Sequence, residues 1–299
     1  MLKFDYFGNG FSLSVGYRFA LAKVPLCLLI GCSTIFGFIL ANPNIAMGSL
    51  CTGAGIFILA TGAATLNSLQ EYRLDGELER TKNRPLPKGV LPPRQAGTQA
   101  VVLLFIGLFV LFAATKAILP VLSAIVAVIL YNGVYTPLKQ KTVLAIVPGA
   151  FCGALPPYIG WLSGGGEAVS YTAILLISLF ILWQMPHFWL ILLNFQEDYG
   201  KSNLPSLLKQ FPEESLKRFF VTWIGALALI MLMFLSLTFP LGSFFSITII
   251  LNACFLLVVF SYGLAFQKAC NYRILFIVLN FTLFLHMVVL IAGRIVTEL

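Results

Sequence analysis

The chain has 299 residues, of which 59% are hydrophobic and only 10% are charged, and its formal net charge is +8. Soluble globular domains carry about 25% charged residues, so this composition excludes an ordinary soluble protein. In so apolar a chain, the excess of Lys and Arg indicates membrane topology rather than nucleic-acid binding. The six cysteines form no CxxC pair and are expected to be small buried hydrophobic residues.

Apolar runs of about 18 to 25 residues recur along the chain, and each is long enough to cross the hydrocarbon core of a bilayer. They predict an all-α, polytopic membrane protein in which residues 1–299 form a single membrane-embedded domain. Nine transmembrane helices are expected, at residues 18–40, 47–70, 97–115, 117–135, 143–162, 168–194, 218–239, 243–266 and 273–293.

The distribution of basic residues predicts the orientation of these helices. If the N-terminus is cytoplasmic, 17 of the 19 Lys and Arg residues fall on the cytoplasmic side, and only Lys116 and Arg294 fall outside. Because Lys and Arg accumulate in cytoplasmic loops, this split supports nine helices and a cytoplasmic N-terminus. The two long polar connections, residues 71–96 and 195–217, then emerge together on the cytoplasmic face.

The end of the second predicted helix carries the first candidate site. Asn67, Glu71 and Asp75 are spaced four residues apart, so all three project from one face of a helix, and Glu79 continues this stripe if the helix persists that far. Carboxylate and amide oxygens are ligands that Mg²⁺ accepts, usually together with the phosphates of a substrate. The stripe therefore predicts a Mg²⁺ site for a phosphate-bearing ligand.

The end of the sixth predicted helix carries a second polar stripe. Gln184, His187, Asn194 and Asp198 fall on one helical face, and Glu197 lies beside Asp198. Polar residues inside membrane helices usually face an internal cavity. We expect the two stripes to meet, because four helices separate them and both become acidic at the cytoplasmic end.

Basic residues accompany both stripes. Arg80, Lys82 and Arg84 follow the first stripe, and Lys139 and Lys141 follow the fourth helix. Arg binds phosphate oxygens in a bidentate manner and Lys acts as a compact charge, so the combination predicts a cradle for a diphosphate. The alternative interpretation is a solvated loop whose charges only obey the positive-inside rule.

These segments also resemble a known family. The string N-x3-(D/E)-x3-D followed by RTKNRPLP resembles the first motif of the intramembrane aromatic prenyltransferase (UbiA-type) superfamily. More narrowly, YTPLKQKTVLAIVPGAFCGALPPYIGW and WQMPHFWLILLNFQEDYGKSNLP resemble the protoheme IX farnesyltransferases, also called heme O synthases. Two departures stand out: Glu71 and Arg73 occupy a run that is commonly D-R-D-x-D, and the second motif ends in P-S-L-L rather than P-M-L-P.

The resemblance implies nine helices around a central cavity and a Mg²⁺-dependent farnesyl transfer from farnesyl diphosphate to a vinyl group of heme b. Water addition would then give heme O, which a heme A synthase or the assembly of a terminal oxidase would consume. It also implies a bacterial cytoplasmic (inner) membrane. Carried onto this chain, it assigns the metal and catalytic positions to Asn67, Glu71, Asp75, Glu197 and Asp198, and diphosphate contacts to Arg80, Arg84 and Lys139.

Four further side chains are candidates for orienting a substrate. His187 is expected to contact heme or the reacting centre, and Gln184, Tyr135 and Tyr199 to orient substrate or diphosphate. His286 is a weaker candidate because a lone polar side chain in an apolar helix can simply bond a neighbouring helix. Three alternative functions remain at this stage: a prenyltransferase that acts on a quinone precursor, a membrane transporter and a non-catalytic heme-binding protein.

Overall fold

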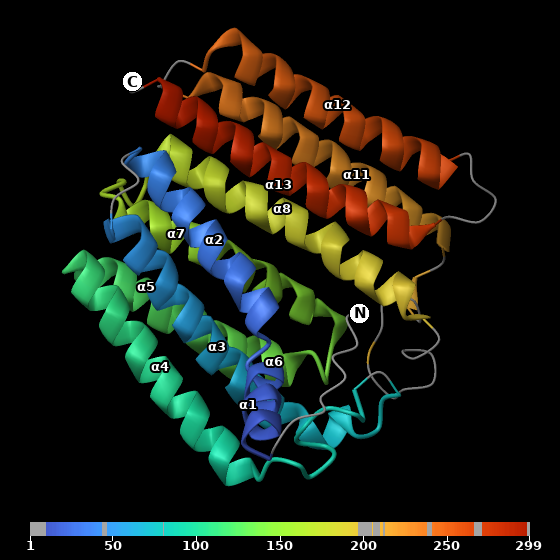
Figure 1. Ribbon diagram of the computed structural model, residues 1–299. Coiled ribbons are helices and arrows are strands. Elements are labelled where there is room, and N and C mark those ends of the chain that lie inside the picture. The colour runs from blue at the N-terminus through green and yellow to red at the C-terminus, as the bar shows by residue number, and fades with distance from the viewer. Residues whose placement is uncertain are drawn as a thin grey trace.

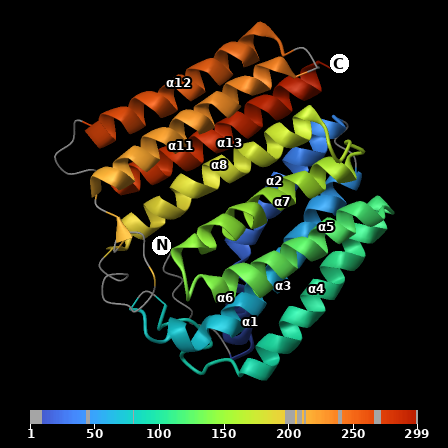
Figure 2. The same ribbon diagram turned by 180° about the vertical axis from the view of Figure 1, so that it is seen from behind.

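The computed structural model describes residues 10–43, 47–79, 81–196, 205, 210–211, 213–237, 241–265 and 271–297. Over these residues the chain is helical, with nine helical segments long and apolar enough to span a membrane. The predicted all-α class and the nine spanning helices are therefore confirmed for this part of the chain. Figures 1 and 2 show the long helices lying roughly parallel to one another in a single bundle.

The helices follow one another along the chain as α1 (Gly10–Leu21), α2 (Val24–Ala41), α3 (Met47–Asp75), α4 (Pro93–Thr115), α5 (Ile118–Val128), α6 (Thr136–Leu138), α7 (Ile146–Ser163), α8 (Tyr171–Asn194), α11 (Glu213–Met233), α12 (Ser243–Ala265) and α13 (Tyr272–Val296). Three shorter elements join them: a π-helix η1 (Ile129–Tyr135) between α5 and α6, and 3₁₀ turns η2 (Val143–Ala145) and η3 (Phe234–Ser236).

The first predicted helix, residues 18–40, is wrong as a single element, because the chain turns between α1 and α2. Lys23 adopts a left-handed conformation, with φ 50° and ψ 43°, and Pro25 follows in the first turn of α2. A continuous helix would press the Pro25 ring against the carbonyl of Leu21, so the break at this point has a steric cause. We call residues Ala20–Val24 the elbow.

The second predicted helix, by contrast, is longer than expected. Helix α3 continues to Asp75, where the Thr81 hydroxyl donates to the Asp75 carbonyl over 2.8 Å and satisfies one of the free carbonyls of the last turn. Glu79 lies beyond this end, is 74% exposed and pairs with Lys82. Glu79 was expected to continue the stripe only if the helix persisted that far, and α3 ends before it.

Glycines allow the backbones at the centre of the bundle to approach closely. A Cβ atom added to Gly37 of α2 would clash with the carbonyl of Pro157, and one added to Gly160 of α7 would clash with the carbonyl of Thr34. Such small residues are typical of helix interfaces in membranes, where close backbone packing replaces the hydrophobic effect. Helix α2 also contacts α3 and α13, so it links the N-terminal and C-terminal helices.

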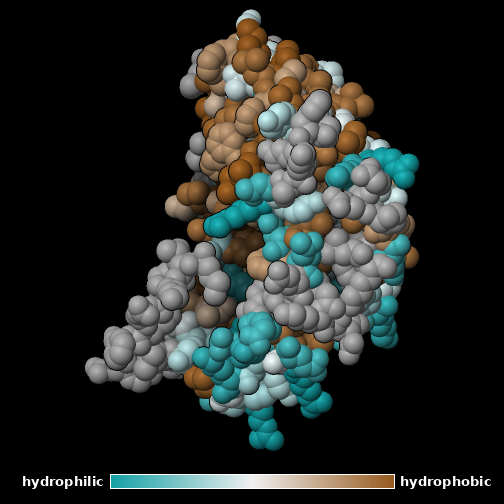
Figure 3. All heavy atoms as spheres, turned by 90° about the vertical axis from the view of Figure 1, so that its right-hand side faces the viewer, coloured by the Kyte–Doolittle hydropathy of each residue, from teal (hydrophilic) through white to brown (hydrophobic). Residues whose placement is uncertain are grey.

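The outside of the bundle is apolar, as expected for a surface in contact with lipid. Phe105 and Phe109 of α4 are each 71% exposed, and Leu251 of α12 is 64% exposed. At the end of the bundle where α3 and α8 finish, Figure 3 shows a recess with hydrophobic residues deep inside and hydrophilic residues along part of its rim. This polar end holds the candidate site.

Candidate functional site

The polar stripe on α3 faces the inside of the bundle. Asn67, Glu71 and Asp75 are 1%, 5% and 6% exposed, although a polar group at the end of a helix would ordinarily be solvated. Buried carboxylates are costly unless cations or hydrogen bonds compensate them. Each of the three side chains therefore requires a partner.

A basic side chain supplies that partner in every case. Lys23 Nζ donates to Asn67 Oδ1 over 2.8 Å, and Arg84 Nη1 donates to Asp75 Oδ2 over 2.7 Å. Lys139 Nζ lies 2.5 Å from Glu71 Oε1. That third contact is an ion pair without hydrogen-bond geometry, so Glu71 Oε1 has no hydrogen-bond partner among the described residues.

Lys139 reaches the stripe through the π-helix η1. Gln70 Nε2 donates to the Asn132 carbonyl over 2.9 Å, and Asn67 Nδ2 donates to Thr136 Oγ1 over 3.0 Å, so α3 holds the middle of η1 and the residue that follows it. π-Helical turns are rare and occur frequently at functional sites. Here the turn directs the residues that follow it, including Lys139, towards α3.

Arg84 is positioned by a small hydrophobic cluster beneath its loop. Leu86, two residues after Arg84, is only 4% exposed and packs with Leu21, Leu91 and Ala96. Consequently, the loop after α3 folds back over the end of the helix, and Arg84 lies beside Asp75. The same cluster holds the elbow through Leu21.

Lys23 occupies an electrostatically unfavourable position. Burial, together with repulsion from Arg84 and Lys139, lowers the pKa of Lys23 to about 8, and the attraction of Glu71 and Asp75 opposes this effect only in part. Lys23, Asp75 and Arg84 line a pocket of about 210 Å³. Three cations thus surround two carboxylates and one amide, an arrangement with spare positive charge for an anion.

The chemistry of the stripe suits a Mg²⁺–diphosphate ligand. The three side chains offer hard oxygen donors, and the ion pair with Lys139 holds the Glu71 carboxylate beside the other two. Among the described residues, no group of three His, Cys, Asp or Glu side chains forms a complete metal site.

A row of rings connects this cluster to His187. The Lys139 ammonium lies 5.5 Å from the centre of the Tyr135 ring, which stacks on Phe188 at 6.1 Å. Phe188 in turn contacts His187 edge-on at 6.1 Å, and His187 packs against Phe276 of α13 at 4.9 Å. His187 Nδ1 is buried without a hydrogen-bond partner among the described residues, so it can form a hydrogen bond with a ligand.

The remaining predicted residues have different outcomes. Arg80, Glu197, Asp198 and Tyr199 lie outside the described residues. Gln184 lies against Gly153 of α7: a Cβ atom added to Gly153 would be 2.8 Å from the Gln184 Oε1 atom. His286 is fully buried and contacts Phe234 edge-on at 5.2 Å.

Arg73, which replaces an acidic residue of the family motif, is exposed. Its guanidinium lies 5.8 Å from the centre of the Tyr72 ring, and its Nε donates to the Tyr72 hydroxyl over 3.3 Å. Arg73 therefore adds no cation to the buried cluster around Asp75.

Two residues of the cluster escaped the sequence interpretation, Lys23 and Thr136. Lys23 was used only as one of the basic residues that indicate membrane orientation, although it lies inside the predicted helix 18–40. An ionisable residue within a predicted membrane helix is by default a candidate functional residue, and that signal would have identified it. Thr136 carried no such signal, because its role depends on η1.

Comparisons with known proteins agree with this geometry. The model of the UbiA prenyltransferase family matches residues 30–289. A protoheme IX farnesyltransferase of Nitratidesulfovibrio vulgaris is 35% identical over 248 residues, which cover 83% of this chain and 85% of that protein. Another protoheme IX farnesyltransferase, from Geobacter sulfurreducens, is 41% identical over 209 residues, which cover 70% and 76%.

Solved structures share the fold at low sequence identity. The chain is similar to a digeranylgeranylglyceryl phosphate synthase, with a TM-score of 0.77, 15% identity and coverage of 94% of this chain and 98% of that one. It is also similar to a UbiA homolog from Archaeoglobus fulgidus bound to GPP and Mg²⁺, with a TM-score of 0.66, 18% identity and coverage of 94% and 99%. This chain belongs to the UbiA prenyltransferase family.

Proposed function

We propose that the protein transfers the farnesyl group of farnesyl diphosphate to a vinyl group of protoheme IX, with addition of water, to give heme O. One observation carries the proposal: Lys23, Arg84 and Lys139 converge on the buried oxygens of Asn67, Glu71 and Asp75. The similarity to protoheme IX farnesyltransferases over most of the chain supports protoheme IX as the acceptor.

The diphosphate would bind between the α3 stripe and the three cations. Asn67, Glu71 and Asp75 would hold Mg²⁺, with Glu197 and Asp198 proposed on the opposite side. A bound Mg²⁺ ion supplies positive charge that stabilises the diphosphate leaving group. Arg84 and Lys139 pair with Asp75 and Glu71, and with Mg²⁺ bound to those carboxylates both cations would be available to phosphate oxygens, together with Arg80.

The residues of this chain then govern each stage of the transfer. The allylic C–O bond breaks and its electron pair leaves with the diphosphate, whose growing charge Lys23, Arg84 and Lys139 stabilise. The apolar interior keeps water from the farnesyl cation until the heme vinyl group attacks it. Water then adds to the cation formed on the heme side chain and loses a proton, which completes the hydroxyethylfarnesyl group.

We assign His187, Tyr135, Gln184 and Tyr199 to the orientation of the acceptor and the diphosphate. The row of rings supports this assignment, because it joins Lys139 in the diphosphate cluster to His187 on α8. We further propose that the polar end of the bundle faces the cytoplasm of a bacterial cell, since the predicted topology assigns 17 of the 19 basic residues to that side.

The test is the formation of farnesylated heme in membranes that contain the chain, supplied with heme b, farnesyl diphosphate and Mg²⁺. Asp75→Asn is expected to lower the rate by about a hundredfold, because it weakens both the metal site and the pairing of Arg84. Glu77→Gln makes the same chemical change at an exposed position two residues away and should leave the rate unchanged.

Two outcomes would contradict the proposal. If Asp75→Asn retains the wild-type rate, the α3 stripe is not the metal site. If the wild-type protein prenylates an aromatic quinone precursor but not heme b in the same assay, the acceptor is wrong while the diphosphate site stands.

A further inference from the structure

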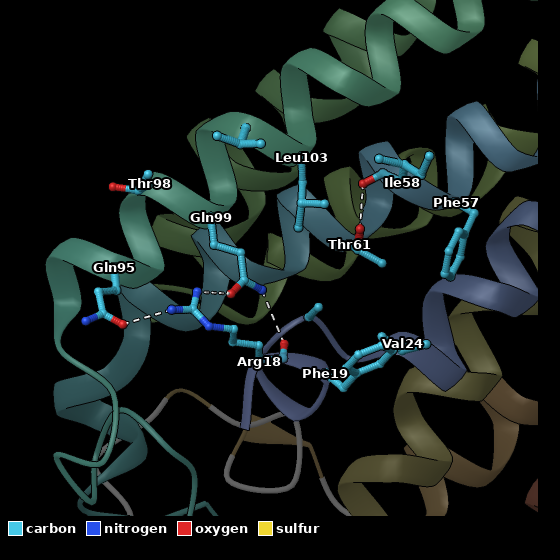
Figure 4. A pocket seen from close by; sticks show the side chains of 12 residues that line it. Arg18, Phe19, Val24, Phe57, Ile58, Thr61, Gln95, Thr98, Gln99 and Leu103 are labelled. Atoms are coloured by element: carbon cyan, nitrogen blue, oxygen red, sulfur yellow. Dashed lines mark hydrogen bonds between the residues drawn. The ribbon is translucent and has the colours of Figure 1, made fainter. Parts of the chain in front are cut away.

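A second pocket lies on the outside of the bundle, away from the polar cluster. It is an open groove of about 570 Å³ between α1, α2, α3 and α4 (Figure 4). Its apolar walls are formed by Phe19, Val24, Phe57, Ile58, Val102 and Leu103. Because α2, α3 and α4 are long and apolar enough to span a membrane, we expect most of this wall at the depth of lipid acyl chains.

The groove has one polar end, which is built around Arg18 of α1. Arg18 Nη2 donates to Gln95 Oε1 over 2.9 Å and Nη1 donates to Gln99 Oε1 over 3.3 Å, while Gln99 Nε2 donates to the Arg18 carbonyl over 3.2 Å. Figure 4 shows the guanidinium held between these two amides. The amides fix its position but are neutral, and among the described residues no carboxylate pairs with Arg18.

We infer that this groove binds an anionic phospholipid, with its phosphate at Arg18 and one acyl chain along the apolar wall. A guanidinium has five N–H donors, of which the two glutamines take two, so others remain for phosphate oxygens. The combination of one fixed cation and a long apolar wall matches a phospholipid, which carries both a charged head and a hydrocarbon chain.

The dimensions of the groove agree with that ligand. From Gln95 to Leu103 the wall follows α4 for about 12 Å at a rise of 1.5 Å per residue, which accommodates a substantial part of one acyl chain. The charged end lies where α4 begins, and the apolar residues extend from there towards the middle of the helix. A lipid in a bilayer leaflet has the same polarity along its length.

The elbow connects the groove to the candidate active site. Arg18, Phe19, Ala22 and Val24 line the groove, whereas Ala20, Leu21 and Lys23 line the pocket that contains Asp75 and Arg84. A lipid in the groove would therefore support the elbow from the side opposite the diphosphate. If the proposed function holds, lipid binding should strengthen diphosphate binding through the position of Lys23.

The experiment measures lipid retention directly, so its result does not depend on turnover. The full-length protein is reconstituted in phosphatidylcholine nanodiscs with increasing phosphatidylglycerol, and bound lipid is counted by native mass spectrometry after release. Arg18→Gln is expected to weaken phosphatidylglycerol binding about tenfold, as for the loss of one charge-assisted contact. Arg94→Gln removes the same charge beside the groove, from a side chain that does not line it, and should have no comparable effect.

A second pair of variants tests the acyl chain. Val102→Trp fills the groove, whereas Val101→Trp places the same ring on an equally lipid-exposed neighbour outside it. Only Val102→Trp should reduce phosphatidylglycerol retention. The inference is overturned if Arg18→Gln binds as well as wild type, if phosphatidylcholine is retained equally, or if inorganic phosphate displaces the ligand and Val102→Trp has no effect.

Discussion

Replacing Lys23 with Met should make the ligand-free protein more stable and its ligand binding weaker. The two effects have opposite signs because burial and two neighbouring cations make the Lys23 ammonium unfavourable while no anionic ligand is bound. Lys23 is buried beside Arg84 and Lys139, and its pKa is lowered from 10.5 to about 8. A structural lysine would instead stabilise the fold, so the sign of the stability change distinguishes the two roles.

The magnitudes follow from the pKa and from the hydrogen bond. A displacement from 10.5 to about 8 corresponds to a cost of about 3 kcal/mol for the protonated side chain at neutral pH. Met avoids this cost but leaves Asn67 Oδ1 without its donor, at about 1 to 2 kcal/mol, so a net gain of about 1 to 2 kcal/mol is expected. Loss of the charged contact should weaken diphosphate binding by about 10- to 100-fold.

The effect on stability should also depend on pH. In metal-free protein, the unfolded state binds more protons than the folded state between pH 8 and pH 10.5, so wild-type stability rises with pH over that interval. Lys23→Met lacks this rise, and its advantage should shrink steadily from pH 8 upwards. Glu71, Asp75, Arg84 and Lys139 face Lys23, and all four are present in both proteins.

The assay uses thermal unfolding in detergent with a chelator, and calorimetric binding of a farnesyl thiolodiphosphate analogue with Mg²⁺. Lys88→Met, at an exposed position, is the control for loss of a positive charge. The reasoning is refuted if Lys23→Met binds the analogue as tightly as wild type, or if it unfolds at a lower temperature.

Three other substitutions have defined consequences. Leu86→Ala should destabilise the loop after α3 by about 2 to 4 kcal/mol and raise the KM for farnesyl diphosphate, and unchanged proteolysis of that loop would contradict this. Gly160→Ala should cost about 2 kcal/mol or more in thermal unfolding, because its methyl group meets the Thr34 carbonyl, and wild-type stability would show that the helices separate easily. His187→Ala should weaken heme binding in an absorbance titration while leaving binding of the diphosphate analogue intact, and equal losses of both would indicate a general disturbance of α8.

Local patterns predicted much of the fold and half of the site. Hydropathy identified the nine spanning segments, because the length of an apolar run is a property of sequence alone. The spacing of Asn67, Glu71 and Asp75 similarly fixed their common face, which required only that α3 continue past residue 70. Lys139 and Arg84, which follow helices that end on the same side, pair with Glu71 and Asp75 of this stripe, and their contact with a diphosphate stays a prediction.

The part of the candidate site that local patterns did not predict depends on contacts between residues far apart in the sequence. The turn at Lys23 places a residue from the predicted first helix next to Asn67, 44 positions later in the chain. Burial of Leu86 folds the loop over the end of α3, but a single leucine in a charged segment does not indicate which surface will cover it. Neither contact follows from periodicity, because each depends on elements that meet only in the folded bundle.

The π-helix η1 has a consequence for the comparison of related sequences. Each residue of an α-helix advances by about 100°, so one residue more or fewer in η1 turns every later side chain by about that angle. A relative with a plain α-helix here would keep the direction of its later side chains only if it were one residue shorter, and an alignment without a gap at η1 would then place its basic residue one column away from Lys139. Equivalence between such sequences must therefore be judged by the direction of the side chain towards α3, and not by its position in the alignment.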